Sequence, residues 1–164
     1  LRYLDRYVLV SQGEVFYTTE MLAQLEGLER GPAGNTSLAA AVSLAKEMEE
    51  DQIIVVQETE YTGAGKHPTA QLTFARQNGV EIRRGDPEEN VPGENIIIPD
   101  HPSRLQAKDV DINKLRRSFL RRLLKSVDTS ELTEKELNFI ATEVNQDKKS
   151  VEALISDIAL EKQA

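Results

Sequence analysis

The chain lacks cysteine, excess positive charge and any long hydrophobic run. Without cysteine there is no disulfide, thiolate nucleophile or cysteine-bound metal. A formal net charge of −8 argues against a general nucleic-acid binder, because nucleic-acid phosphates repel an acidic surface. No apolar run approaches the ~20 residues that span a bilayer. We therefore expect neither nucleic acid nor a membrane as partner, and the composition is compatible with the cytoplasm.

An initiating methionine and a signal-peptide layout are also missing from the first residues, "LRYLDRYVLV". This favours a processed product or a fragment of a longer protein. The 164 residues suffice for one domain with a core, with or without an appendage.

The first hundred residues alternate between helical and strand patterns. Ser11 and Glu14 form a capping box that starts a helix, and Gly27 is its expected end. Asn35 or Thr36 is the expected cap of a second, alanine-rich helix. The continuous apolar run Gln52–Gln57 is typical of a strand buried on both faces of a parallel sheet. Further expected elements are a short strand at Tyr7–Val10, a helix at Thr69–Gly79 and strands at "VEIRR" and "NIIIP".

From Asp109 the composition changes to three amphipathic helical patterns, the second of which opens with a capping box at Thr133 and Glu136. The expected boundary lies near Pro99–Lys108. The predicted fold class is α/β, a partial three-layer sheet with parallel strands and flanking helices, followed by a helical tail. The predicted domains are residues 1–100 and 109–164.

The turn "TGAGK" at residues 62–66 invites a phosphate-loop interpretation, but the pattern fails because Glu60 stands at the first glycine position and His67 replaces the magnesium-binding hydroxyl. Lys66 in a Gly/Pro turn is expected to be solvated rather than a Schiff-base lysine. A zinc site is rejected because the sequence has only two histidines, His67 and His101, at unsuitable spacing.

Two further features leave alternatives open. "GNTS" (34–37) is either a helix cap or, at a helix N-terminus, a site for an anion. The basic helix after Asp109 favours a solvated face or a subunit contact over nucleic acid, given the acidic total. Its cations are Lys114, Arg116, Arg117, Arg121, Arg122 and Lys125.

The order of elements "EG", "PAG", an alanine-rich helix, "IIVVQ" and "TGAG" resembles the C-terminal part of fold-type II pyridoxal-phosphate enzymes, the group of threonine, cysteine and tryptophan synthases. More narrowly, most of residues 1–125 resemble the C-terminal third of the family of 2-amino-4-ketopentanoate thiolase β subunits. The resemblance implies pyridoxal 5'-phosphate as cofactor. It also implies thiolytic cleavage of an amino-keto acid by coenzyme A, giving acetyl-CoA and alanine in ornithine catabolism.

The same resemblance assigns cofactor contacts. Thr62 matches the hydroxyl residue that bonds the pyridine nitrogen, and Gly63 and Gly65 let the backbone pass close to the ring. Glu26 matches a glutamate near the ring, and Gly34 belongs to the wall beneath it. The family's Schiff-base lysine and phosphate loop have no counterpart here, and its "PAS" is "PAG". "GNTS" also resembles the substrate-carboxylate loop of these enzymes, which would make Asn35 and Thr36 bind that carboxylate; the C-terminal placement is preferred because "TGAG" follows the strand.

No catalytic residue is therefore expected in this segment, and the chain alone should be inactive. The implied partners are the upstream part of the same subunit, a smaller α subunit, the amino-acid substrate and coenzyme A, within a cytoplasmic oligomer. Two alternatives stay open, another fold-type II lyase or synthase and a non-enzymatic α/β interaction module.

Overall fold

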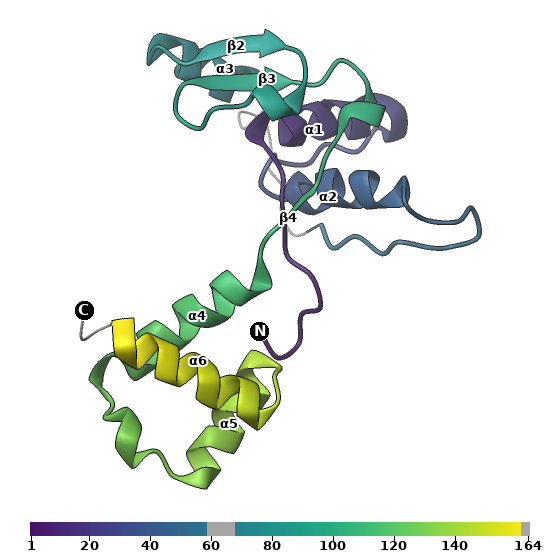
Figure 1. Ribbon diagram of the computed structural model, residues 1–164. Helices are drawn as coiled ribbons and strands as arrows, with labels where there is room; N and C mark the ends of the chain where they lie inside the picture. The colour runs from purple at the N-terminus through teal and green to yellow at the C-terminus, as the bar shows by residue number, and fades with distance from the viewer. Residues whose placement is uncertain (59–67, 162–164) are drawn as a thin grey trace. The chain divides into compact units, whose positions relative to one another are not determined.

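The computed structural model describes residues 1–58 and 68–161 (Figure 1). The described residues form a mixed α/β structure with six α-helices and two small sheets, and its C-terminal region is helical. The chain divides into two compact units, Val8–Lys108 and a helical unit made of Leu1–Tyr7 and Asp109–Ala164. No helix among the described residues is long and apolar enough to cross a membrane.

The α/β unit is organised around a two-stranded parallel sheet. Strand β2 (Glu81–Arg84) pairs with β3 (Asn95–Ile98), with Ile82 opposite Ile96. Both expected strands are thus confirmed. Their connection carries a short 3-10 turn, Pro87–Glu89, which Asp86 caps. The short strands β1 (Val8–Leu9) and β4 (Lys108–Asp109) form the second sheet.

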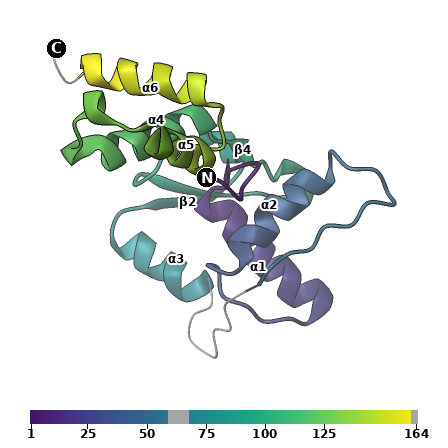
Figure 2. The ribbon, with the colours of Figure 1, turned by 90° about the horizontal axis from the view of Figure 1, so that it is seen from below.

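Three helices build the rest of this unit (Figure 2). Helix α1 (Gln12–Glu26) packs against both β3 and α2 (Asn35–Ala45). Helix α3 (Pro68–Gln77) lies on β2 and also contacts α1. The order is therefore sheet, then α1 with α3, then α2. The core residues are Val15, Phe16, Ala39, Ala41, Ile96, Ile97 and Leu105.

Helix α1 begins as its sequence predicts. Ser11 accepts from the N–H of Glu14, and the Glu14 carboxylate accepts from the N–H of Ser11 at 2.6 Å, so the capping box is present. At the other end Gly27 takes a left-handed conformation with φ of 64°, which glycine adopts without steric strain.

The predicted buried strand at Gln52–Gln57 is wrong for this structure. Residues 52–58 have no regular secondary structure, and Ile53 and Val55 are 85% and 91% exposed. A strand needs a hydrogen-bonded neighbour, and none of the described residues pairs with this segment. The described sheets have two strands each, so the expected three-layer parallel sheet is not seen.

The helical unit packs three helices around one core. They are α4 (Ile112–Leu123), α5 (Glu134–Val144) and α6 (Lys148–Glu161). The capping box of Thr133 and Glu136 is present, as predicted. The buried core residues are Leu120, Leu124, Ile140, Ala141, Val144, Val151, Ile155 and Ile158.

Candidate functional site

The described structure contains two of the five predicted cofactor-contacting residues. Thr62, Gly63 and Gly65 lie outside the described residues, as do Lys66 and His67. Their predicted roles therefore stay predictions. Glu26 and Gly34 are described, and each sits at the end of a helix.

Glu26 is the last residue of α1 and is exposed. The helix ends there because the N–H of Gly27 donates back to the carbonyl of Ala23 at 3.1 Å. At 1.5 Å rise per residue, Glu26 lies roughly 15 Å along α1 from Phe16, which is in the core. Its carboxylate thus faces solvent at one end of the helix.

Gly34 is buried and stands at the N-cap position of α2, where no side chain caps the helix. The expectation that Asn35 or Thr36 caps α2 is therefore wrong. Both residues already belong to the first turn, and each turns its side chain back to the preceding loop. The hydroxyl of Thr36 donates to the carbonyl of Pro32, and the amide of Asn35 donates to the carbonyl of Gly31.

Asn35 is fully buried between α1 and α2. Its Nδ2 donates to the hydroxyl of Thr19 on α1 at 3.1 Å, and that hydroxyl donates onward to the carbonyl of Val15 at 2.7 Å. Its Oδ1 has no hydrogen-bond partner in the described structure. The amide nitrogen of Asn35 therefore binds α2 to α1. In this arrangement it does not face a site where it could donate to a substrate carboxylate.

A cavity of about 390 Å³ lies beside the "PAG" loop. Its lining residues are Pro32 and Ala33 of the loop, Thr36 of α2, and Val10, Gln12, Val15, Phe16 and Gln71. None of these lining residues carries a charge. Five of the eight are apolar and three, Gln12, Thr36 and Gln71, are polar, so this lining holds no cation for a phosphate group and no lysine for the aldehyde of pyridoxal phosphate.

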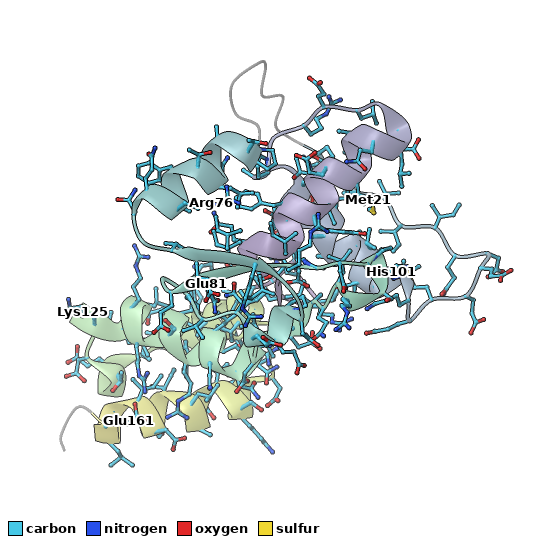
Figure 3. All side chains as sticks on the ribbon, turned by 90° about the horizontal axis from the view of Figure 1, so that it is seen from above. Met21, Arg76, Glu81, His101, Lys125 and Glu161 are labelled. Atoms are coloured by element: carbon cyan, nitrogen blue, oxygen red, sulfur yellow. The ribbon has the colours of Figure 1, made fainter. Side chains whose placement is uncertain are left out.

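A larger cavity of about 650 Å³ lies at the carboxyl ends of β2 and β3. This is the edge where parallel sheets commonly bind ligands. Phe16, Tyr17 and Met21 of α1 line it, and Figure 3 labels Met21 on that helix. Arg84 at the end of β2 is the one arginine or lysine among its described lining residues. It makes no ion pair within the described part of the chain.

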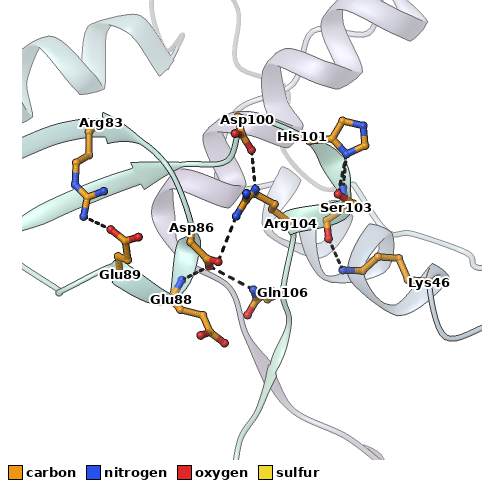
Figure 4. Close-up of polar contacts among 10 residues, drawn as sticks. All are labelled: Lys46, Arg83, Asp86, Glu88, Glu89, Asp100, His101, Ser103, Arg104 and Gln106. Atoms are coloured by element: carbon orange, nitrogen blue, oxygen red, sulfur yellow. Dashed lines mark hydrogen bonds and ion pairs between the residues drawn. The ribbon is translucent and has the colours of Figure 1, made fainter.

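Polar contacts hold the segment that follows β3 (Figure 4). Arg104 pairs with Asp100 at 2.9 Å and with Asp86 at 3.3 Å. Lys46, just after α2, donates to the carbonyls of Ser103 and Leu105 at 3.1 and 2.5 Å. Through these contacts the segment 100–106 is bound to the end of α2 by Lys46 and to the residues after β2 by Arg104.

His101 contributes to the same segment as a turn cap. Its Nδ1 lies 2.8 Å from the hydroxyl of Ser103 and accepts from the backbone N–H of that residue. No group of three or more histidine, aspartate or glutamate side chains among the described residues is placed to hold a metal ion.

Glu14 has a structural role beyond the capping box, and local sequence rules do not predict it. Glu14 is 2% exposed, and besides the N–H of Ser11 its carboxylate accepts from the N–H of Gln106 at 2.5 Å. Residue 106 is 92 positions away, so periodicity and capping rules carry no signal for this contact. The carboxylate joins the start of α1 to the segment after β3.

The basic residues of α4 are mostly occupied within the helical unit. Arg116 is 9% exposed and donates to the carbonyls of Val144 and Asn145 at the end of α5. Arg117 and Arg121 both pair with Glu161 of α6, at 2.6 and 2.5 Å. These hydrogen bonds lower the pKa of the Glu161 carboxyl, that from Arg121 contributing most.

Sequence comparison adds what the described geometry does not contain. Nearly the whole chain is similar to thiolase β subunits. It is 56% identical over 160 residues, 98% of the chain, to a "2-amino-4-ketopentanoate thiolase beta subunit" from an unknown prokaryotic organism. A protein of the same name from Acetoanaerobium sticklandii is 56% identical over 158 residues, 96% of the chain.

The chain spans about a third of the length of each of these relatives, 34% in both cases. No protein-family model matches the chain. No solved structure matches it either. The similarity therefore concerns one third of a longer polypeptide.

Proposed function

We propose that the chain is a portion of a 2-amino-4-ketopentanoate thiolase β subunit and that the intact subunit is a fold-type II, pyridoxal-phosphate-dependent enzyme. The observation that carries the proposal is 56% identity across 98% of the chain to a protein of that name. Identity of this extent over 160 residues reaches far beyond the short "TGAG" motif.

The proposed reaction joins coenzyme A to an acetyl group and releases alanine. A carbon–sulfur bond forms at the C4 carbonyl of 2-amino-4-ketopentanoate, the C3–C4 bond breaks, and a proton is added at C3. When bound, pyridoxal phosphate supplies electron withdrawal at the amino-acid carbon. The protein contributes binding, orientation and electrostatics.

In this proposal the chain's own residues form one side of the cofactor site. Thr62 donates a hydrogen bond to the pyridine nitrogen, and Gly63 and Gly65 leave room for the ring. Pro32 and Gly34, both buried, support the uncharged wall beside the 390 Å³ cavity. Glu26 is assigned to the site by the resemblance alone, since its carboxylate is exposed in this structure.

The aldehyde anchor and the phosphate site belong, in this proposal, to the rest of the subunit. The chain by itself is then inactive. Because the relatives are named β subunits, a smaller α subunit is the proposed partner of the intact protein, in a cytoplasmic oligomer.

The test uses a full-length chimera in which this chain replaces the matching third of the Acetoanaerobium sticklandii β subunit. With the α subunit, pyridoxal phosphate, coenzyme A and 2-amino-4-ketopentanoate, we expect acetyl-CoA and alanine in equal amounts. Thr62→Ala should shift the cofactor absorbance and reduce turnover at least about tenfold, which is one lost hydrogen bond of ~1.4 kcal/mol.

Thr73→Ala is the matched control, because within the described structure the hydroxyl of Thr73 bonds to its own helix, at the carbonyl of Thr69. A folded chimera that binds pyridoxal phosphate but cleaves only other amino acids would favour another fold-type II enzyme. A folded chimera without cofactor binding would favour the non-enzymatic module. Borohydride labelling of the isolated chain at Lys66 would contradict the assignment of the anchor elsewhere.

A further inference from the structure

The cavity of about 650 Å³ at the carboxyl ends of β2 and β3 has two chemically different walls. One wall is a face of α1, because Tyr17, Glu20 and Gln24 are three and four residues apart and therefore lie on one side of the helix. The other wall is the end of the sheet, where Arg84 and Ile98 are direct neighbours on the paired strands. The fold thus brings the acceptor groups of a helix and the guanidinium group of a strand to the same space.

Three polar side chains of this lining make no hydrogen bond or ion pair within the part of the chain that the structure describes. They are the guanidinium group of Arg84, the hydroxyl of the half-buried Tyr17 and the amide of Gln24. A guanidinium group holds its N–H donors in a planar fork that matches the two oxygens of a carboxylate. A few convergent polar groups of this kind, set among apolar side chains, are what fixes a small molecule in a cavity.

The charges of the lining favour a ligand that carries both signs. Its charged residues in the described structure are Glu20, Arg84 and Asp100, and Asp100 is paired with Arg104 at 2.9 Å. Glu20 also interacts with another group, but a carboxylate has roughly four acceptor positions and can accept further N–H donors. A simple anion at Arg84 would be repelled by the carboxylates of the same cavity. A ligand with a carboxylate and an ammonium group satisfies Arg84 and Glu20 together.

The remaining surface of the cavity is mainly apolar. Phe16 and Met21 of α1, Leu72 of α3 and Ile98 of β3 line it. Methionine adapts its shape to a ligand because its side chain is unbranched and flexible. A volume of about 650 Å³ is within the range of sites for small organic molecules. The cavity therefore suits a small zwitterion with an apolar side chain.

We propose that this cavity binds a free α-amino acid with an apolar side chain, such as leucine or methionine. Arg84 binds the carboxylate of the amino acid, Glu20 accepts from its ammonium group, and its side chain lies against Phe16 and Met21. The proposal goes beyond the proposed function and needs neither the cofactor nor the thiolytic reaction. Amino-acid binding and thiolase activity can therefore fail separately.

Isothermal titration of the chain with L-leucine tests the proposal, and we expect saturable binding with a Kd of about 1 mM or tighter. Two analogues each remove one charge: 4-methylpentanoate lacks the ammonium group and 3-methylbutylamine lacks the carboxylate. Each should bind at least about tenfold more weakly than leucine, because one charged group of the cavity loses its partner. Binding of 4-methylpentanoate as tight as that of leucine, or no binding of leucine up to about 10 mM, would overturn the proposal.

Amide chemical shifts locate the bound amino acid, and a second ligand identifies its class. On addition of leucine the amides of Glu20, Gln24 and Arg84 should shift, whereas those of α5 in the helical unit should not; the reverse pattern would contradict the site. The proposed substrate, 2-amino-4-ketopentanoate, has the same zwitterionic end but a polar side chain. Tighter binding of that substrate than of leucine would overturn the assignment to an apolar amino acid. If the chain alone does not fold, the same titrations on the full-length chimera decide.

A matched pair of arginine substitutions separates binding from general stability. Arg84→Met removes the guanidinium group of the cavity, whereas Arg76→Met removes an exposed one on α3, outside the cavity (Figure 3). Both should leave the urea midpoint unchanged, and only Arg84→Met should weaken leucine binding, by at least about tenfold. Glu20→Gln should weaken the binding of leucine but not that of 4-methylpentanoate. Equal leucine affinities of the two arginine variants would refute the assignment of Arg84.

Discussion

Helix α1 approaches the sheet so closely that a single methyl group at Gly13 should separate them. A Cβ atom on Gly13 would lie 1.8 Å from the carbonyl oxygen of Ile97 and 2.5 Å from its carbonyl carbon. Real Cβ contacts are essentially never shorter than 3.0 Å. Because the obstacle is backbone of β3, no side-chain rotation relieves it, and the helix must move away by more than an ångström.

The size of the effect follows from two opposed terms. In an open helix, Gly→Ala stabilises by about 1 kcal/mol. A radial gap of ~1 Å forfeits up to about half of each dispersion contact across an interface, which for one well-buried side chain is of order 3 kcal/mol. Val15 and Phe16, adjacent in α1, are buried and would lose such contacts. With one to two such side chains affected and the helix gain subtracted, Gly13→Ala should destabilise the α/β unit by about 2–5 kcal/mol.

Urea unfolding followed by circular dichroism, with amide exchange at Ile97 and Ile98, measures this loss. Gly27→Ala is the matched control, because nothing lies within 4 Å of the position that its added methyl group would take, and its φ of 64° alone opposes alanine. That strain costs about 1–2 kcal/mol. A Gly13→Ala protein as stable as the parent would refute the close approach.

Three further predictions concern buried or paired charges. Glu14→Gln should destabilise the α/β unit by about 1–3 kcal/mol in urea, because one carboxylate serves two backbone donors, the N–H groups of Ser11 and Gln106. Arg116→Met should destabilise the helical unit by about 2–4 kcal/mol, measured by exchange at core amides, because it removes the hydrogen-bond donors of two carbonyls at the end of α5. The pKa of Glu161 is lowered in the folded chain, so the stability it contributes is present above its ordinary pKa of 4.5 and is lost as pH falls; Glu161→Gln should flatten a thermal-melting profile below that pH.

Each of these predictions has a control in the chain. Glu29→Gln changes an exposed carboxylate and should leave the urea midpoint unchanged. Arg116→Lys keeps the charge but not the fork of donors, so it should recover only part of the loss. Glu131→Gln should leave the pH profile as it is, because Glu131 forms no ion pair in the described structure. Equal effects in variant and control would contradict the corresponding contact.

Local signals predict most of the individual elements. Both capping boxes, the left-handed Gly27 and the two strands around Ile82 and Ile97 follow from neighbours within a few residues. The side-chain preferences of N-cap positions predict Asn35 or Thr36 as the cap of α2, but the cap is Gly34. These preferences concern neighbours in sequence, whereas Asn35 is held by Thr19 of another helix.

Non-local relations account for the rest. The strand expected at Gln52–Gln57 needs neighbours that the described chain does not supply. The inward position of Arg116 depends on where the end of α5 lies, which composition does not encode. For the candidate site, sequence patterns favour ordinary structural roles for Lys66 and "GNTS", and the cofactor roles come from the resemblance. They remain predictions at Thr62, Gly63 and Gly65.

The helical unit is assembled from both ends of the described chain. Arg6 grips Asp109, 103 residues away, with two hydrogen bonds, and the N–H of Val110 donates to the carbonyl of Tyr7. During synthesis, residues 1–7 therefore cannot form these contacts until residues 8–110 have been made. The core of the helical unit lies within residues 120–158, so only the docking of residues 1–7 depends on the closure of this long loop. The chain passes from one unit to the other twice, after Tyr7 and after Lys108. A proteolytic cut at one of these two connections would leave the units covalently joined by the other connection.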